Sequence, residues 1–157
     1  IAAAIITQLE GFENTGKTVA FFFVNSDGSI VIRKPTDYIP KMIELAGGRY
    51  AFENFVTDQT NTSVSVTMET FYGTAVDADV LIYNSAIEGM IASVSQLTER
   101  FPLLNEFKAV QNGQVWCTTQ SLFQQSMELA DLISDMNLVF TEGRPDPASL
   151  RFLQQIV

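Results

Sequence analysis

The stretch Lys17–Tyr50, KTVAFFFVNSDGSIVIRKPTDYIPKMIELAGGRY, contains most of the information about the fold. Val19–Val24 is a continuous apolar run of strand length. Asn25–Gly28 consists of residues that tolerate left-handed backbone and are typical of tight turns. Ser29–Arg33 has strand length and is predicted to be the returning strand. The pattern predicts two strands joined by a turn, and therefore one antiparallel strand pair.

A helix is predicted to follow this hairpin, beginning at Asp37. Pro40 is compatible with the first turn, where its missing N–H group has no helical partner to lose. Gly47 and Gly48 are expected to end the helix with positive φ angles. The apolar residues that predict one buried face have the spacing i, i+3, i+4, i+7, and they are Ile39, Met42, Ile43 and Ala46.

Strands and helices continue to alternate after an irregular, polar segment at residues 49–63. Further strands are predicted at residues 64–66, 79–84 and 114–118, and further helices at 67–76, about 91–99, 103–107, 121–136 and 147–156. Residues 80–83 are apolar without alternation, which is typical of a sheet covered on both faces. The sequence thus predicts an α/β fold, a three-layer αβα sandwich with a mixed, mostly parallel sheet.

The composition excludes several classes of function. The chain of 157 residues is long enough for one domain with a full core. It has 18 acidic and 9 basic residues, a net charge of −9, and so lacks the basic surface that nucleic-acid binding requires. Histidine is absent, which excludes Ser-His-Asp and Cys-His catalysis and histidine-ligated zinc or haem within this sequence. The single cysteine, Cys117, excludes an internal disulfide.

The beginning of the sequence is unusual. Residues 1–10 have the apolar spacing of a helix, but the segment starts without Met and without a capping residue. Two interpretations remain open, a piece of a longer protein and an ordinary frayed terminus. No signal peptide is visible, and no window reaches the ~18 consecutive apolar residues of a membrane span.

Four motifs, in this order and spacing, resemble one family. They are ELAGGRY (Glu44–Tyr50), VTMETFY (Val66–Tyr72), DADVLIYN (Asp77–Asn84) and FKAVQNGQVWC (Phe107–Cys117). The sequence from Lys17 to Val157 resembles the C-terminal lobe of substrate-binding proteins of bacterial ABC importers, in the subgroup that delivers iron–siderophore complexes, haem and cobalamin.

This resemblance implies a bilobed binding protein with its ligand in the cleft between the lobes. Residues 1–16 would be the end of the interlobe helix and a linker, residues 17–157 would form the C-terminal lobe, and the N-terminal lobe would be missing. The implied partners are the ABC permease, a small organometallic ligand and the protein's own N-terminal lobe. The implied location is extracytoplasmic, either periplasmic or lipid-anchored. No enzymatic activity, catalytic residue, cofactor or resident metal is expected.

Glu69 is the candidate for docking to the permease. In the family, a surface glutamate on each lobe pairs with arginines of the permease, and Glu69 occupies the matching helix start. Carboxylate–arginine pairing can be bidentate, which orients the partners as well as attracting them. The alternative is a glutamate that only complements the positive end of its helix.

Seven residues are candidates for ligand binding. Most of them lie at predicted strand ends, where α/β folds commonly place ligand groups. The alternatives are a solvated strand end for the basic pair, ordinary loop polarity for the Asn-Ser pair, and a core position for the tryptophan. The candidates are Arg33, Lys34, Tyr38, Asn84, Ser85, Trp116 and Phe123.

Two other functions remain as alternatives. A flavodoxin-like or Rossmann-like enzyme would need a phosphate-binding turn after the first strand, but the sequence there is Asn25–Gly28 without G-x-G-x-x-G. An interaction module without a small ligand is the second alternative, and ligand titration of the intact protein would distinguish it from a binding protein.

Overall fold

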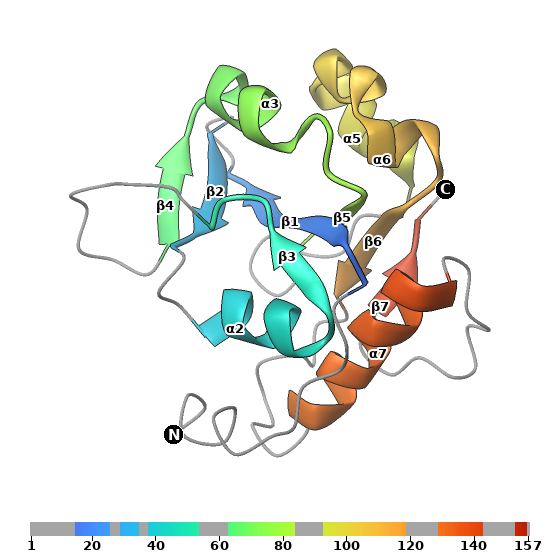
Figure 1. Cartoon of the computed structure of the whole chain (residues 1–157). Coiled ribbons are helices and arrows are strands. Elements are labelled where there is room, and N and C mark those ends of the chain that lie inside the picture. Colours follow the sequence, from blue (N-terminus) through green and yellow to red (C-terminus); the bar gives the residue numbers. More distant parts are fainter. Residues whose placement is uncertain are drawn as a thin grey trace.

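A computed structural model describes residues 15–25, 29–34, 38–53, 63–83, 93–118, 129–142 and 153–156. Its centre is a seven-stranded sheet in the order β4-β2-β1-β5-β6-β7, with β3 also paired to β1 (Figure 1). The strands are β1 (Lys17–Val24), β2 (Ile30–Arg33), β3 (Gly48–Tyr50), β4 (Ser63–Val66), β5 (Val80–Tyr83), β6 (Val115–Thr118) and β7 (Leu153–Gln155).

The sheet is mixed, as the sequence predicts. β1, β5 and β6 are parallel neighbours at its centre, whereas β2, β4 and β7 add antiparallel pairings toward the edges. Two strands pair with the side of β1 that faces away from β5. β2 pairs with residues 22–24, and β3 pairs in parallel with residues 17–19. Parallel pairing is therefore confined to the centre of the described sheet and makes up a smaller share than the sequence predicts.

Helices cover both faces of the sheet. They are α2 (Tyr38–Leu45), α3 (Met68–Ala75), α5 (Val94–Arg100), the 3₁₀-helix η1 (Pro102–Glu106), α6 (Lys108–Gln111) and α7 (Leu129–Glu142). α2 and α7 lie on one side of the sheet, and α3, α5 and α6 lie on the other (Figure 1). The α/β layering is thus confirmed. No helix in the described ranges combines the length and the apolar character needed to cross a bilayer.

The structure confirms the hairpin pairing, the proline position and the helix cap that the sequence predicts around α2 and α3. β1 and β2 form the expected hairpin pairing, with Phe22 opposite Ile32. Pro40 lies in the first turn of α2. The Thr67 hydroxyl caps α3 by accepting a hydrogen bond from the Thr70 N–H at 3.2 Å. Gly47 ends α2 with a φ of 94°.

Gly48 is a correction to the sequence prediction. Its φ is not positive, because Gly47 alone of the pair adopts the left-handed conformation. Gly48 instead begins β3, whose other two residues, Arg49 and Tyr50, fall in the segment predicted to be irregular. The reason for glycine is space: a Cβ atom at Gly48 would lie 2.7 Å from Cε2 of Phe140. The short helix α6 was also not predicted.

The C-terminal predictions were partly wrong. α7 continues to Glu142 instead of ending near Met136, and residues 153–155 form strand β7 instead of part of a helix. β7 pairs with the outer edge of β6, and the Ile156 N–H donates to the Val115 carbonyl at 3.0 Å. The predicted helix 1–10, the turn at 26–28 and residues 121–128 lie outside the described residues.

Candidate functional site

The carboxyl ends of the central parallel strands meet at one edge of the sheet. β5 and β6 are in register there, with Tyr83 opposite Cys117. The candidates Asn84 and Ser85 directly follow β5, and Phe123 follows β6, but all of them lie outside the described residues. The topology therefore brings the chain segments that lead to these candidates to a common edge, which is the usual ligand-binding edge of an open α/β sheet.

Hydrogen bonds hold the described backbone of this edge in place. Arg100 at the end of α5 donates from Nη2 to the Asn25 carbonyl at 2.6 Å. The Asn25 side chain donates to the Ser29 hydroxyl at 3.1 Å, across the base of the hairpin turn. Sequence reasoning did not identify Arg100, since a single basic residue at a helix end carries no distinctive pattern.

Asp135 in α7 holds the start of β7, the strand next to β6, at this edge of the sheet. Its carboxylate is buried and accepts a hydrogen bond from the Leu153 N–H at 3.2 Å, which connects α7 to β7. In the sequence, the acids Glu128, Asp131 and Asp135 have the spacing of the polar face of a helix, and for the buried Asp135 that interpretation is wrong. Its position three residues after Leu132 and four before Val139 does place it on the apolar face once α7 is known to reach Glu142.

Arg33 and Lys34 do not share the carboxyl edge with the residues after β5. β2 runs antiparallel to β1, so that β2 begins opposite Val24 and ends alongside the middle of β1. Arg33 pairs with Ser63 at the start of β4. Both basic residues are partly exposed. Tyr38 opens α2, and its side chain is outside the description.

Trp116 lies in the core, as one of the two alternatives for this residue predicts. Its side chain is buried within β6, and its Nε1 donates to Oε1 of Gln114 at 3.3 Å. Cys117, its neighbour, is also buried and is a free thiol. Neither residue is presented to solvent by the described structure.

Glu69 has the exposure that docking requires. It lies in the first turn of α3, directly after the Thr67 cap, and its side chain is exposed. Phe71, two residues later, is fully buried and anchors the helix. The geometry is compatible both with a docking contact and with the alternative of a helix-start acid.

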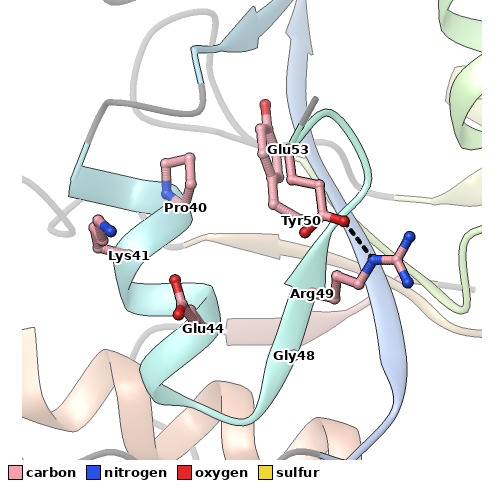
Figure 2. Close-up of a pocket in the computed structure, with 7 residues that line it drawn as sticks. All are labelled: Pro40, Lys41, Glu44, Gly48, Arg49, Tyr50 and Glu53. Atoms are coloured by element: carbon pink, nitrogen blue, oxygen red, sulfur yellow. Dashed lines mark ion pairs between the residues drawn. The ribbon is translucent and has the colours of Figure 1, made fainter. Parts of the chain in front are cut away.

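A pocket of about 310 Å³ lies between α2 and β3, away from the carboxyl edge (Figure 2). Pro40, Lys41 and Glu44 form its α2 wall. Across from them, Arg49 and Glu53 form an ion pair at 2.7 Å. Gly48 and Tyr50 complete the lining. The sequence analysis did not predict this pocket, because it depends on β3.

A second hollow of about 390 Å³ lies at the amino edge of the sheet and contains an ion pair. Lys108 Nζ lies 2.6 Å from Oδ1 of Asp79, and Oδ2 accepts a hydrogen bond from the Thr18 N–H at 3.0 Å. Burial by itself raises the pKa of Asp79, but the hydrogen bonds from Lys108 and Thr18 and the nearby lysine charges outweigh it and lower the pKa below the ordinary 3.8. The described residues contain no cluster of three or more potential metal ligands.

Substituting Lys108 with methionine is expected to raise the pKa of Asp79, because the partly buried carboxylate loses its main partner. In the unsubstituted protein the lowered pKa stabilises the fold above the ordinary pKa of aspartate, and this contribution is lost as the pH falls through the lowered value. NMR titration of the Asp79 carboxyl group measures the change. An unchanged pKa in Lys108→Met, with Lys41→Met as the control, would contradict this account.

No family model and no curated protein sequence matches this chain. Solved structures do match. A periplasmic haem-binding protein from Pseudomonas aeruginosa has a TM-score of 0.67 at 13% identity, over 99% of this chain and 52% of that one. An ABC-type Fe³⁺-hydroxamate transport protein from Saccharomonospora viridis gives 0.63 at 17% identity, over 89% and 45%. The siderophore periplasmic binding protein from the fuscachelin gene cluster of Thermobifida fusca gives 0.61 at 17% identity, over 91% and 49%.

These structural neighbours are binding proteins rather than enzymes. This chain spans about half the length of each of the three. At such low identity the likeness concerns the fold, which agrees with the mixed sheet and its two helical layers. The chain therefore has the fold of one lobe of a bilobed periplasmic binding protein.

Proposed function

We propose that this chain is the C-terminal lobe of the solute-binding component of an ABC importer. Its cargo would be an iron–siderophore complex or a related organometallic compound such as cobalamin or haem. The protein would work outside the cytoplasmic membrane, in the periplasm or on a lipid anchor, and would hand its cargo to the permease. It would catalyse no reaction and need no cofactor.

The observation that supports this proposal most strongly is the extent of the structural match. Nearly the whole chain aligns with about half of a haem-binding protein, at a TM-score of 0.67. The siderophore periplasmic binding protein and the Fe³⁺-hydroxamate transport protein align over similar shares. The four sequence motifs lead independently to the same family, since they depend on residue identity and not on the arrangement of the strands.

The proposed mechanism is closure of two lobes around the cargo. A ligand that contacts both lobes stabilises the closed form, because it gains contacts there that the open form does not offer. In this lobe the contacts would come from the carboxyl edge of β5 and β6, where Asn84, Ser85 and Phe123 are expected. The basic pair Arg33 and Lys34 follows a strand that ends away from this edge, so it is not included in the proposed contact. The role proposed for Trp116 is limited to supporting β6 from the core.

Titration of the full-length protein that contains this chain tests the function. Isothermal calorimetry with ferric citrate, a ferric tris-catecholate, a ferric hydroxamate, haemin and cyanocobalamin should show saturable binding of at least one compound. Mass spectrometry of material that co-purifies with the protein gives an independent result. Absence of binding to all five compounds, together with binding of a nucleotide or flavin, would favour the enzymatic alternative.

Substitution of Glu69 with glutamine should reduce uptake of the cargo without changing the affinity for it. Glu69 is exposed at the start of α3 and would present its carboxylate to an arginine of the permease. We expect a loss of transport of about tenfold, in line with removal of one charge-assisted contact. Uptake of radiolabelled iron complex by cells, alongside calorimetry on the purified variant, measures both quantities.

Glu99 provides the matched control for this experiment. Glu99 is an exposed acidic residue near the end of α5, and its substitution with glutamine removes the same charge. Glu99→Gln should leave transport unchanged. Equal transport by Glu69→Gln and the unsubstituted protein would assign Glu69 to the alternative role, stabilisation of its own helix start.

A further inference from the structure

The turn between α6 and β6 consists of Asn112, Gly113 and Gln114 (Figure 1). Asn112 is the only asparagine of the sequence that is followed by glycine. Its φ and ψ angles are −93° and 1°, and Gly113 adopts a left-handed φ of 71°. The function proposed above makes no use of this Asn-Gly pair, although the pair belongs to one of the four sequence motifs.

The side-chain amide of Asn112 is exposed, and it makes no hydrogen bond with another described residue. Two other described asparagines differ in this respect. Nδ2 of Asn105 donates to the Pro102 carbonyl at 3.1 Å. Nδ2 of Asn137 donates to the Ala46 carbonyl at 3.0 Å. The amide of Asn112 can therefore change its orientation without breaking such a bond.

The main-chain nitrogen of Gly113 is the nucleophile nearest in sequence to this amide. Glycine has no side chain that would hinder the approach of this nitrogen to Cγ of Asn112, and it can adopt the backbone angles that the approach requires. The ψ angle of Asn112 has to rotate away from 1° before the two atoms meet. This rotation breaks the hydrogen bond from the Gly113 N–H to the Val110 carbonyl, which at 3.3 Å is longer than is usual. A local opening of the turn is sufficient, and the rest of the fold stays intact.

We propose that Asn112 is a site of spontaneous deamidation. The Gly113 nitrogen bonds to Cγ of Asn112, the bond from Cγ to Nδ2 breaks, and Nδ2 leaves as ammonia with the proton that the glycine nitrogen gives up. Water then opens the resulting succinimide ring. Cleavage of the new bond to Cγ gives aspartate, whereas cleavage of the original main-chain bond gives isoaspartate. The inference does not depend on the proposed function.

The surroundings of Asn112 give the product a measurable effect. Asn112 lines the hollow at the amino edge of the sheet together with Lys17, Asp79 and Lys108. Lys108 is the ion-pair partner of Asp79. A new carboxylate at position 112 would attract the same ammonium group and repel the carboxylate of Asp79. Deamidation is therefore expected to raise the pKa of Asp79 relative to that in the intact protein.

The experiment is incubation of the full-length protein at physiological temperature and mildly alkaline pH, followed by peptide mass spectrometry at successive times. Asn105 and Asn137 are internal controls, because neither precedes glycine and both have hydrogen-bonded amides. Asn112 should deamidate at least about tenfold faster than either control, a difference of about 1.36 kcal/mol in activation free energy. Enzymatic methylation of isoaspartate detects the second product independently. Deamidation of Asn112 at the rate of the controls would overturn the inference.

Two variants test the expected effect in the hollow. Asn112→Asp supplies the new carboxylate directly, and Asn112→Ser is the uncharged control. NMR titration should show a higher pKa of Asp79 in Asn112→Asp than in Asn112→Ser. The deamidated protein should show the same upward shift as Asn112→Asp. Equal pKa values of Asp79 in the two variants would overturn the placement of the product carboxylate beside the Asp79–Lys108 ion pair.

Discussion

Replacement of Phe71 with alanine is expected to lower the free energy of unfolding by about 3–5 kcal/mol. Phe71 has no exposed surface and is one of the two buried residues of α3. Its ring centroid lies 4.8 Å from that of Phe22 in β1, 5.5 Å from that of Phe107 before α6, and 5.9 Å from that of Phe52 after β3. Alanine would leave a cavity that these three rings cannot fill without moving their own strands and helices.

Chemical denaturation monitored by circular dichroism measures this effect. Since a domain of this size has a total stability of about 5–15 kcal/mol, the variant should unfold at a much lower denaturant concentration. Phe101→Ala is the control, because Phe101 is only partly buried, between α5 and η1, and should cost clearly less. A loss for Phe71→Ala no greater than that of Phe101→Ala would show that the layer repacks around the cavity.

The same substitution links the core to the proposed docking contact. Glu69 lies two residues before Phe71 on α3, and Phe71 is the buried residue nearest to it on that helix. Phe71→Ala should therefore reduce uptake of the cargo even when the variant still folds.

Glu69→Gln should, by contrast, leave the denaturation midpoint close to its original value, because an exposed side chain contributes little to stability.

The elements that were predicted from the sequence are those with local causes. The strand–turn–strand pattern of Lys17–Arg33 and the capped helix at Thr67 depend on residues that are neighbours in the chain. Their apolar spacing, turn residues and caps specify the same structure, and the structure confirms the pairing of the two strands and the Thr67 cap. The parallel alignment of β1, β5 and β6 follows from the alternation of strands and helices.

The elements that were missed depend on distant partners. β3 and β7 are three residues long, and each exists because a neighbouring strand offers a free edge. Leu153–Gln155 has the sequence LQQ, which has no strand preference of its own, and the apolar spacing around it also fits a helix. Short segments of this kind are specified by tertiary hydrogen bonds, which a pattern within one segment does not reveal.

The residues of the candidate site also differ in how far the sequence could place them. Asn84 and Ser85 could be assigned to the end of a strand, because the order of strands and helices alone gives that position. For Arg33 the sequence held information that the prediction did not use. The predicted hairpin makes β2 antiparallel to β1, and this already implied that β2 ends away from the carboxyl edge. The two hydrogen bonds between the Tyr50 hydroxyl and the main chain of Arg33 were not predictable, because they require β3. β3 in turn requires the space that Gly48 leaves for Phe140.

A single methyl group added at Gly48 is expected to destabilise the protein, because the space beside this residue is already occupied. A Cβ atom there would lie 2.7 Å from Cε2 of Phe140 in α7 and 3.1 Å from Cγ2 of Ile43 in α2. Both neighbours are buried, so neither can move aside freely. Gly48→Ala should lower the free energy of unfolding by about 1–3 kcal/mol through overpacking.

Gly73→Ala is a control of opposite sign. Gly73 lies within α3, and a Cβ atom there meets no atom within 4 Å. Alanine at an exposed helical position should raise stability by about 0.5–1 kcal/mol, because it lowers the entropy of the unfolded chain and favours the helix. Thermal denaturation of both variants gives the comparison directly.

A second substitution identifies the cause of the loss at Gly48. Phe140→Leu removes both ring atoms, Cε2 and Cζ, that lie within 3.1 Å of the added methyl group. By itself it leaves a small cavity and should destabilise the protein. Combined with Gly48→Ala, it should cost less than the sum of the single changes, because the methyl group occupies part of the vacated space. Additive losses would show that Gly48→Ala acts through the backbone of β3 and not through contact with α7.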